Sequence, residues 1–339
     1  MNGIDSIKIY SSLDVLQDIS LDNFINSQKK LNGKLIGEKF TKTDFNTPGL
    51  KYIEYDPFAK EPEQIIIQFS AKILKDKYFE LININTIDQV LDVINSTNAL
   101  KIDKSKADQL FIHSADFTKN VNCSYTPGQI IGACKTITND RYMVETYKGS
   151  KDNRYKTGIV FRGKQKTFNE RLIIYDKETE LKKEKKFLEQ VSKPLEILRQ
   201  FANVTRTEIN VTSHRKIKEL CKTDNNLINI LQSKEVPVYK TFNKINHFDY
   251  KQLEIFNYPD HYKLYMIEKI EGRKGIIQKL NYDPELVRDF LKKVLGSKNV
   301  SRYVKEYSQL ITEMKMNENG NVELTNDIIN EFEILLKTA

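Results

Sequence analysis

The sequence is poor in several residue types that mark common protein classes. Its 339 residues include no Trp, 13 Gly, 8 Pro and 3 Cys. The low Gly and Pro content, together with 39% hydrophobic residues, excludes a low-complexity or disordered chain and predicts a folded protein with a sizeable core. Cys123, Cys134 and Cys221 have no paired spacing, which argues against a disulfide scaffold or a zinc ribbon. We expect all three to be buried as small apolar groups.

Several sequence motifs are also missing. The chain has no GxxxxGK[ST], GxSxG or CxxC pattern, and its 4 His residues form no His-hydrophobic-His pair. The longest apolar runs, such as Ile65–Ile67, are too short to span a bilayer. Residues 1–5 show no basic start followed by an apolar run, so we expect no signal peptide and a place in the reducing cytoplasm.

The charge balance favours a polyanionic partner. The net charge is +8 with a pI of about 9.0, and residues 141–193 alone hold 15 Lys or Arg against 8 Asp or Glu, a net of +7. A local excess of this kind is typical of nucleic-acid binding. A solvated helix surface, for example at Leu181–Phe187, is the simpler alternative.

The residue patterns predict an α+β fold. An antiparallel sheet with helices packed on one face, in a split β-α-β order, fits the alternation of elements, and the other face would be open to a ligand. Residues 1–50 are expected to be polar and irregular, with some helical character at 11–26. Strands are expected at 51–55, 64–69, 109–118, 142–147, 157–162, 171–176 and 204–211, and helices at 86–96 and 213–220.

Two regions are predicted along the chain. Residues 1–222 would form the first, with a core at about 50–222, and 223–339 would be a mainly helical C-terminal region. The boundary is expected within 222–245. Helical patterns at 284–295, 300–314 and 325–336 support the second region, which we expect to help in DNA or partner binding.

Tyr175 is a candidate nucleophile at the end of an apolar strand pattern. A tyrosine in such a strand is usually a packed aromatic residue, and the sequence alone leaves that alternative open. A phenol has a pKa near 10 and is a poor nucleophile at neutral pH. Lys177 follows two residues later, and a nearby cation would favour the phenolate and neutralise charge on a phosphate under attack.

Glu208 and Asp116 are candidate metal ligands. The side of the strand pattern 204–211 that carries Arg206 and Glu208 is wholly polar, and it could simply face water with an exposed ion pair. Asp116 lies on an earlier strand pattern and would need a partner if it were buried. If the two strands are neighbours, the two carboxylates could share Mg²⁺ or Mn²⁺ with water and a phosphate oxygen.

Several segments together resemble the gene II/X family of phage and plasmid replication proteins. This family includes the rolling-circle initiators of filamentous phages and shares motifs with the Rep_trans plasmid initiators. Residues 157–181 are similar to the family's hairpin that ends in a Tyr-x-Lys strand followed by x-x-Glu-Leu, and 198–208 to its Phe-Ala helix end followed by Arg-x-Glu. The family's Arg-x-Asp strand is matched at Asp116, but its arginine position is Ser114 here.

The resemblance implies a palm similar to that of HUH endonucleases and a nick at a replication origin exposed as single-stranded or cruciform DNA. Tyr175 would form a 5′-phosphotyrosyl adduct and leave a 3′-hydroxyl, and the strand would later be rejoined. Lys177 would stabilise charge on the phosphate or lower the pKa of Tyr175, and Asp116 and Glu208 would hold Mg²⁺ or Mn²⁺. Host helicase and polymerase would be partners.

The basic residues around these segments would grip the DNA backbone, in contacts that weaken with salt. The predicted set is Lys148, Lys151, Arg154, Lys156, Arg162, Lys164, Lys166, Arg171 and Arg206. Three other functions remain open from the sequence: a mobilisation relaxase with the same chemistry, a non-catalytic origin-binding protein, and a nucleic-acid-binding module without a replication role.

Overall fold

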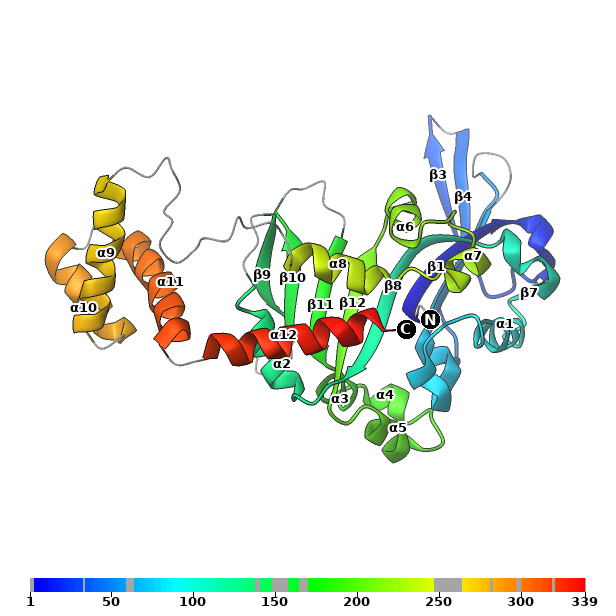
Figure 1. The fold of residues 1–339 in the computed structure, drawn as a ribbon. Coiled ribbons are helices and arrows are strands. Elements are labelled where there is room, and N and C mark those ends of the chain that lie inside the picture. The colour runs from blue at the N-terminus through cyan, green and yellow to red at the C-terminus, as the bar shows by residue number, and fades with distance from the viewer. Residues whose placement is uncertain are drawn as a thin grey trace. The chain divides into compact units, whose positions relative to one another are not determined.

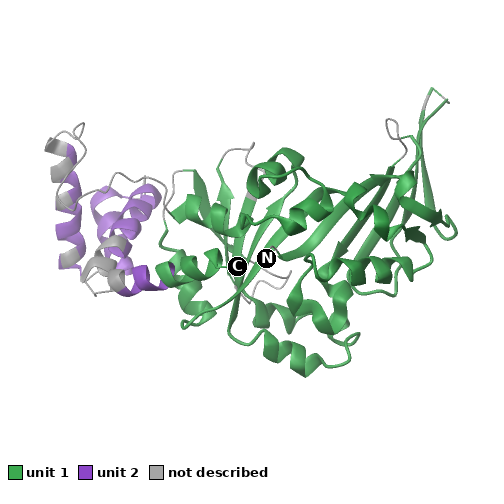
Figure 2. Ribbon diagram, turned by 45° about the vertical axis from the view of Figure 1, so that its right-hand side comes forward, with its two compact units in different colours: residues 1–246, 330–339 green, residues 247–329 purple. Residues whose placement is uncertain are grey.

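The computed structural model describes residues 3–32, 34–58, 64–137, 141–147, 158–164, 170–246, 264–280, 283–296, 300–318 and 321–338. The chain divides into two compact units, residues 1–246 with 330–339, and residues 247–329 (Figure 2). The observed division thus falls just after the predicted boundary region. The last ten residues, which the sequence pattern places in the helical C-terminal region, belong to the first unit.

A ten-stranded antiparallel sheet forms the centre of the first unit, and this confirms the prediction of a mixed fold with a large antiparallel sheet (Figure 1). The strand order is β3-β4-β5-β6-β1-β8-β12-β11-β10-β9. The strands are β1 (Gly3–Ser12), β3 (Ile25–Leu31), β4 (Lys34–Lys42), β5 (Leu50–Asp56), β6 (Gln64–Ser70), β8 (Phe111–Asn122), β9 (Tyr142–Tyr147), β10 (Gly158–Gly163), β11 (Glu170–Asp176) and β12 (Val204–Val211). A separate pair joins β2 (Leu16–Ile19) to β7 (Leu100–Ile102).

The N-terminal region is not irregular, as the sequence pattern suggests, but supplies the central strand β1. This strand pairs with β6 on one side and β8 on the other. The alternation of buried and exposed side chains in β1 is interrupted at Asp5. Ile4 pairs with Phe117 and Ser6 pairs with Asp116, so Asp5 has no partner position in β8. The extra residue is a β-bulge, which re-aims a side chain and breaks the period of two. Ile4 and Ile7 are therefore both buried although they are three residues apart.

A second irregularity lies in β8 at His113. Tyr10 of β1 pairs with Phe111, Ile9 pairs with Ile112, and Lys8 pairs with Ser114. The extra residue in β8 puts Phe111 on the same face of the sheet as Tyr10. Phe111 therefore shares a face with Asp116, although strict alternation along β8 would place the two on opposite faces.

Both faces of the sheet are covered near the start of β12, where Thr205 and Arg206 have no exposed surface. Helices α2 (Pro127–Cys134) and α8 (Pro237–Asn246) pack on one face of β11 and β12 (Figure 1). On the other face, η2 (Ala71–Glu80) and α5 (Pro194–Gln200) bring Tyr78 and Phe201 against Arg206. The prediction that helices cover only one face is wrong at this position.

The remaining helical elements of the first unit are short. The charged segment after β11 forms separate short helices, with a break at the turn before Lys185 and another before Pro194. The elements are η1 (Leu13–Val15), α1 (Ile87–Asn95), η3 (Lys104–Gln109), α3 (Lys177–Leu181), α4 (Lys185–Leu188), α6 (His214–Cys221) and α7 (Leu227–Gln232). The three cysteines are buried and free, as predicted.

The second unit is helical, in agreement with the pattern of apolar residues. Buried side chains of α9 (Leu264–Lys279), α10 (Pro284–Leu295) and α11 (Val300–Glu318) form its core, among them Ile277, Leu291 and Tyr307. Pro284 starts α10 after the N-cap Asp283. The last helix, α12 (Asn321–Lys337), extends into the residues assigned to the first unit. Within the described parts of the chain, no helix has the length and apolar character needed to cross a membrane.

Candidate active site

Tyr175 is held at the end of β11 by its two neighbouring strands. It pairs with Gly158 of β10 on one side and with Arg206 of β12 on the other. A Cβ atom at position 158 would lie 2.5 Å from the Tyr175 Cβ and would overlap the carbonyl oxygen of Ile174, so only glycine fits there. The ring of Tyr147, from β9, lies 5.1 Å from the Tyr175 ring across this glycine.

The hydroxyl of Tyr175 is hydrogen-bonded to Glu208. Tyr175 Oη donates to Glu208 Oε1 at 2.7 Å, and Lys177 Nζ lies 3.4 Å from the same hydroxyl. Glu208 points to this face because it lies two residues from Arg206 on a regular strand. The structure therefore brings together three residues that the sequence singles out, from β11, β12 and the start of α3.

Lys177 is placed by the helix that follows β11. Asp176 caps that helix, since its carboxylate accepts hydrogen bonds from the Thr179 backbone amide at 3.0 Å and from the Thr179 hydroxyl at 2.6 Å. The ammonium of Lys177, the first helical residue, is buried and lies over the rings of Tyr78 and Tyr175, 5.2 and 5.5 Å from their centroids. Burial, and after it the charge of Arg206, lowers the pKa of Lys177 to about 8.

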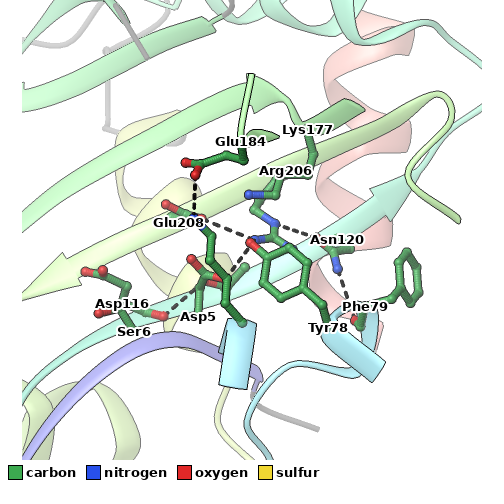
Figure 3. Close-up of polar contacts among 12 residues, drawn as sticks. Asp5, Ser6, Tyr78, Phe79, Asp116, Asn120, Lys177, Glu184, Arg206 and Glu208 are labelled. Carbon is green, nitrogen blue, oxygen red and sulfur yellow. Dashed lines mark hydrogen bonds and ion pairs between the residues drawn. The ribbon is translucent and has the colours of Figure 1, made fainter. Parts of the chain in front are cut away.

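Arg206 lies in the interior and connects four other side chains (Figure 3). Its Nη1 donates to Asp5 Oδ1 at 2.9 Å and to the Tyr78 hydroxyl at 3.0 Å, and its Nε donates to Asn120 Oδ1 at 2.8 Å. Glu208 Oε1 is 3.7 Å from Nη1. Because Arg206 has no exposed surface, the predictions that it contacts DNA or forms an exposed ion pair are wrong.

The site places two carboxylates and two cations in a poorly solvated region. Burial, and then the negative charge of Asp5, raises the pKa of Glu208 to about 7. Burial acts to raise the pKa of Asp5 as well, but Arg206 and Lys177 outweigh it and lower that pKa. Asp5 therefore carries the negative charge opposite Arg206, while Glu208 can accept a proton near neutral pH.

The pKa of Tyr175 is raised well above its usual value, first by burial and then by the adjacent Glu208 carboxylate. Any lowering of this pKa by Lys177 is thus outweighed in the arrangement seen here. The Tyr175 side chain is only 3% exposed. A phosphate can reach the hydroxyl only after the side chain or its cover moves.

Asp116 occupies the next row of the same face. It pairs with Asn210 of β12 on one side and Ser6 of β1 on the other. Asn210 Nδ2 donates to Asp116 Oδ1 at 2.5 Å, which supplies the partner that a buried aspartate requires. Burial nevertheless raises the pKa of Asp116. Since Glu208 pairs with Thr118, the two carboxylates are diagonal neighbours on adjacent strands, so the condition for a shared cation, that the two strands are neighbours, is met.

The chemistry of these donors fits a hard divalent cation. Mg²⁺ is usually bound by one or two carboxylates and keeps waters or phosphate oxygens as its other ligands. Burial raises the pKa values of Asp116 and Glu208 because it disfavours their charged forms. A bound cation would stabilise those charged forms. In the described residues, no group of three or more His, Cys, Asp or Glu side chains is arranged to hold a metal. Any cation here would depend on non-protein ligands.

The eight predicted DNA contacts other than Arg206 fall into three groups. Arg162 and Arg171 are exposed and lie opposite each other on the neighbouring strands β10 and β11. Asn210 of β12 and Asp116 of β8 continue the same row across the sheet. Lys164 is exposed just after β10. Lys148, Lys151, Arg154, Lys156 and Lys166 lie outside the described residues.

Three members of the site are not among the candidates that the sequence patterns indicate. Asp5 is 201 residues from Arg206, and the bulge that turns it inward also hides the strand pattern. Tyr78 lies in η2, which has a kink at Lys75. Asn120 is two residues beyond the predicted end of its strand, which extends to Asn122. A longer strand prediction would have placed Asn120 on the Asp116 face.

Comparisons with known proteins do not assign the chain to a family. No protein-family model matches the chain, and no curated protein matches its sequence. Among solved structures, the rolling circle replication initiator protein from Geobacillus stearothermophilus has 8% sequence identity and a TM-score of 0.29. That match covers 62% of this chain and 74% of the other. Likeness at this level does not establish a shared fold.

Proposed function

We propose that the protein nicks one DNA strand at a replication origin by attack of Tyr175 on a phosphodiester. The Tyr175 oxygen forms a bond to phosphorus, and the bond from phosphorus to the 3′ oxygen breaks. The products are a 5′-phosphotyrosyl adduct and a 3′-hydroxyl, and the reverse reaction rejoins the strand. Origin DNA in single-stranded or cruciform form is the proposed substrate, and host helicase and polymerase are the proposed partners.

The hydrogen bond from Tyr175 Oη to Glu208 Oε1 at 2.7 Å is the observation that carries the proposal. A nucleophilic hydroxyl needs an acceptor for its proton within hydrogen-bond distance, and a carboxyl group with a pKa of about 7 is suited to that exchange. Lys177, 3.4 Å from the hydroxyl, can neutralise charge on the phosphate. A purely structural tyrosine would not require a buried acid and a buried cation at its hydroxyl.

We also propose that Mg²⁺ or Mn²⁺ takes part, with Asp116 and Glu208 as its protein ligands. The bound cation would polarise the phosphate as a Lewis acid and orient it. Arg206 binds no DNA in this proposal. Its hydrogen bonds to Asp5 and Asn120 fix the strands beneath Glu208, so it acts as a positioning residue.

The exposed Arg162 and Arg171 are proposed to hold the DNA backbone beside the site. They lie in one row with Asn210 and Asp116, so a strand bound there passes next to the carboxylates. Lys164 and the five basic residues outside the described part of the chain are proposed to extend this contact. Binding of this type weakens steeply with salt because phosphate contacts release counterions.

A non-catalytic origin-binding protein is the second candidate, and one observation favours it. Tyr175 is buried, and its pKa is raised by burial, as expected of a tyrosine that serves only in packing. A mobilisation relaxase would use the same chemistry as the first candidate, and the site does not distinguish the two.

A covalent-adduct assay separates cleavage from binding. The protein is incubated with 3′-labelled single strands that carry a library of hairpins, with Mn²⁺, and is then run on a denaturing gel. We expect a labelled band that migrates above the free protein and that disappears with EDTA and with Tyr175→Phe. Tyr147→Phe is the matched control and should keep the band. DNA binding without any adduct in the wild-type protein would favour the origin-binding alternative.

A further inference from the structure

The face of the sheet that carries Asp116 continues beyond the active site as a half-exposed aromatic surface. In β1, the side chains at 6, 8, 10 and 12 share this face, and the register with β8 and β6 extends it. Strand β5 adds Tyr52, which pairs with Gln68. We call this surface the aromatic platform, and it consists of Tyr10, Tyr52, Phe111, His113 and His214 with Lys8 and Lys51.

The opposite face of the same strands is an ordinary core. Ile7, Ile9 and Ile67 are each at most 1% exposed. Lys8 and Tyr10 alternate with Ile7 and Ile9 along β1, and both are half-buried. One face of β1 is thus packed and the other is accessible, which is the usual state of an antiparallel sheet with one open face.

The rings on the open face are arranged as a stacking surface. Tyr10 and His214 are stacked with centroids 5.4 Å apart and planes 10° apart, and Phe111 lies 5.7 Å from Tyr10. His113 meets His214 edge to face at 5.3 Å. Four partly exposed rings from the strands, Tyr10, Tyr52, Phe111 and His113, with His214 of α6 stacked on Tyr10, are unusual on a face that borders water, because such a face normally carries small polar and charged side chains. Flat rings of this kind are the surfaces on which unpaired bases stack.

The charges of the platform complement a phosphate backbone. Lys8 Nζ lies 5.6 Å from the centroid of the Tyr52 ring, and Lys51 Nζ is 3.2 Å from Ser6 Oγ. Neither lysine is ion-paired with a carboxylate within the described residues. The acids at the far edge, Glu54 and Asp56, are both paired with Lys39, at 2.8 and 3.2 Å. The platform therefore has a net positive charge.

The platform is continuous with the proposed active site. Ser6 pairs with Asp116, Lys8 with Ser114, and Tyr10 with Phe111. Four residues of strand separate Ser6 from Tyr10, a distance of about 13 Å. A single strand that stacks its bases at Tyr10 would therefore pass Lys8 and deliver its next phosphates to the Asp116 row.

We propose that the aromatic platform binds single-stranded DNA, with bases stacked on Tyr10 and Tyr52 and phosphates held by Lys8 and Lys51. The proposal rests on the proposed function, which it deepens by giving the bound strand a path and by specifying an unpaired strand. Stacking on rings is tolerant of sequence, so the platform supplies affinity for an open strand and not recognition of particular bases. A duplex, whose bases are already stacked, would gain little from it.

Binding is measured by fluorescence anisotropy with labelled oligothymidine of 15 nucleotides, in EDTA so that cleavage does not interfere. Tyr10→Leu and Tyr52→Leu should each weaken binding of the single strand about tenfold. The same two substitutions should change the affinity for a duplex of the same length by less than about twofold. Lys8→Gln should reduce the slope of log affinity against log salt by about 0.7. Tyr55→Leu is the matched control, since Tyr55 lies on the same strand as Tyr52 but pairs with the core residue Ile65. Thermal unfolding verifies that each variant is folded.

Photo-crosslinking gives an independent readout that does not depend on affinity. Oligothymidine with 5-iododeoxyuridine should crosslink to peptides that contain Tyr10, Tyr52 or His214. Crosslinks confined to other surfaces, or equal losses for Tyr52→Leu and Tyr55→Leu, would overturn the proposal. Neither readout requires cleavage, so a Tyr175→Phe protein that still forms the adduct would refute the nucleophile and leave the platform standing.

Discussion

The hydroxyl of Tyr175 donates a hydrogen bond of 2.7 Å to the carboxylate of Glu208, from two strands that are direct neighbours in the sheet. Tyr175 is buried and the Glu208 side chain is only 12% exposed, and burial raises the pKa of each. In a solvated site water could accept the Tyr175 proton, but in this poorly solvated site Glu208 is the acceptor at hydrogen-bond distance. The chemistry proposed for the protein depends on this contact and on the residues that hold it.

Arg206→Gln is expected to destabilise the protein strongly. The substitution removes a buried guanidinium that is bonded to Asp5, Tyr78 and Asn120, and it leaves the Asp5 carboxylate without its cation. Breaking one partner of a buried ion pair costs about 3–5 kcal/mol in the free energy of unfolding. The exposed Arg171→Gln should change that free energy by less than about 0.5 kcal/mol. Urea unfolding checks both, and similar small losses would contradict the structural role of Arg206.

Gly158→Ala should displace Tyr175 while leaving the rest of the sheet folded. The new methyl group would lie 2.5 Å from the Tyr175 Cβ. Overpacking of this kind costs about 1–3 kcal/mol of stability, and a shift of about 1 Å in a reacting group can cost a hundredfold in rate. Gly132→Ala, in α2, meets no atom within 4 Å and is the control. Adduct formation is measured for both, and an unchanged rate in Gly158→Ala would show that the position of Tyr175 is unimportant.

Glu208 should make stability fall as the pH rises. Its pKa is about 7 in the folded chain against an ordinary value of 4.5. The folded state therefore holds the proton more tightly, a stabilisation present below about pH 4.5 and lost as the pH rises to about 7. In EDTA, urea unfolding between pH 5 and 7 should show this loss in the wild type but not in Glu208→Gln. The exposed Glu189→Gln should behave as the wild type.

The two carboxylates should also control the affinity for Mn²⁺. A cation binds deprotonated carboxylates, so calorimetry should find tighter binding at pH 8 than at pH 6. Asp116→Asn and Glu208→Gln should each weaken binding at least about tenfold, the loss seen even for outer partners of metal ligands. Asp22→Asn, on an exposed turn, should have no effect. Equal affinities for all these variants would remove the proposed metal site.

The sequence predicts best those strands whose apolar residues form short, regular runs. Strands β11 and β12 lie at 170–176 and 204–211, within one residue of their predicted ranges, so the separation of Tyr175 and Glu208 along the chain was informative. The same holds for α10, which the residue pattern delimits at both ends. These elements depend on local alternation, helical spacing and an N-terminal proline, and all of these are visible without the fold.

Long-range pairing and irregular geometry explain what the sequence does not predict. In β1 the bulge at Asp5 shifts the apolar side chains from even to odd positions, so no period of two runs through Gly3–Ser12. The residue pattern therefore does not predict the strand that carries Asp5, although Asp5 forms an ion pair with Arg206 at 2.9 Å. The burial of Arg206 was also hidden, because its cover comes from Tyr78 and Phe201 on distant segments.

The most direct test of the account is to identify the residue that carries the DNA. The adduct formed with single-stranded hairpin DNA is digested with nuclease and protease, and the modified peptide is sequenced by mass spectrometry. We predict a nucleotide linked through its 5′ phosphate to Tyr175. A nucleotide on Tyr147, whose ring lies 5.1 Å away, or on any other residue would contradict the assignment of the nucleophile.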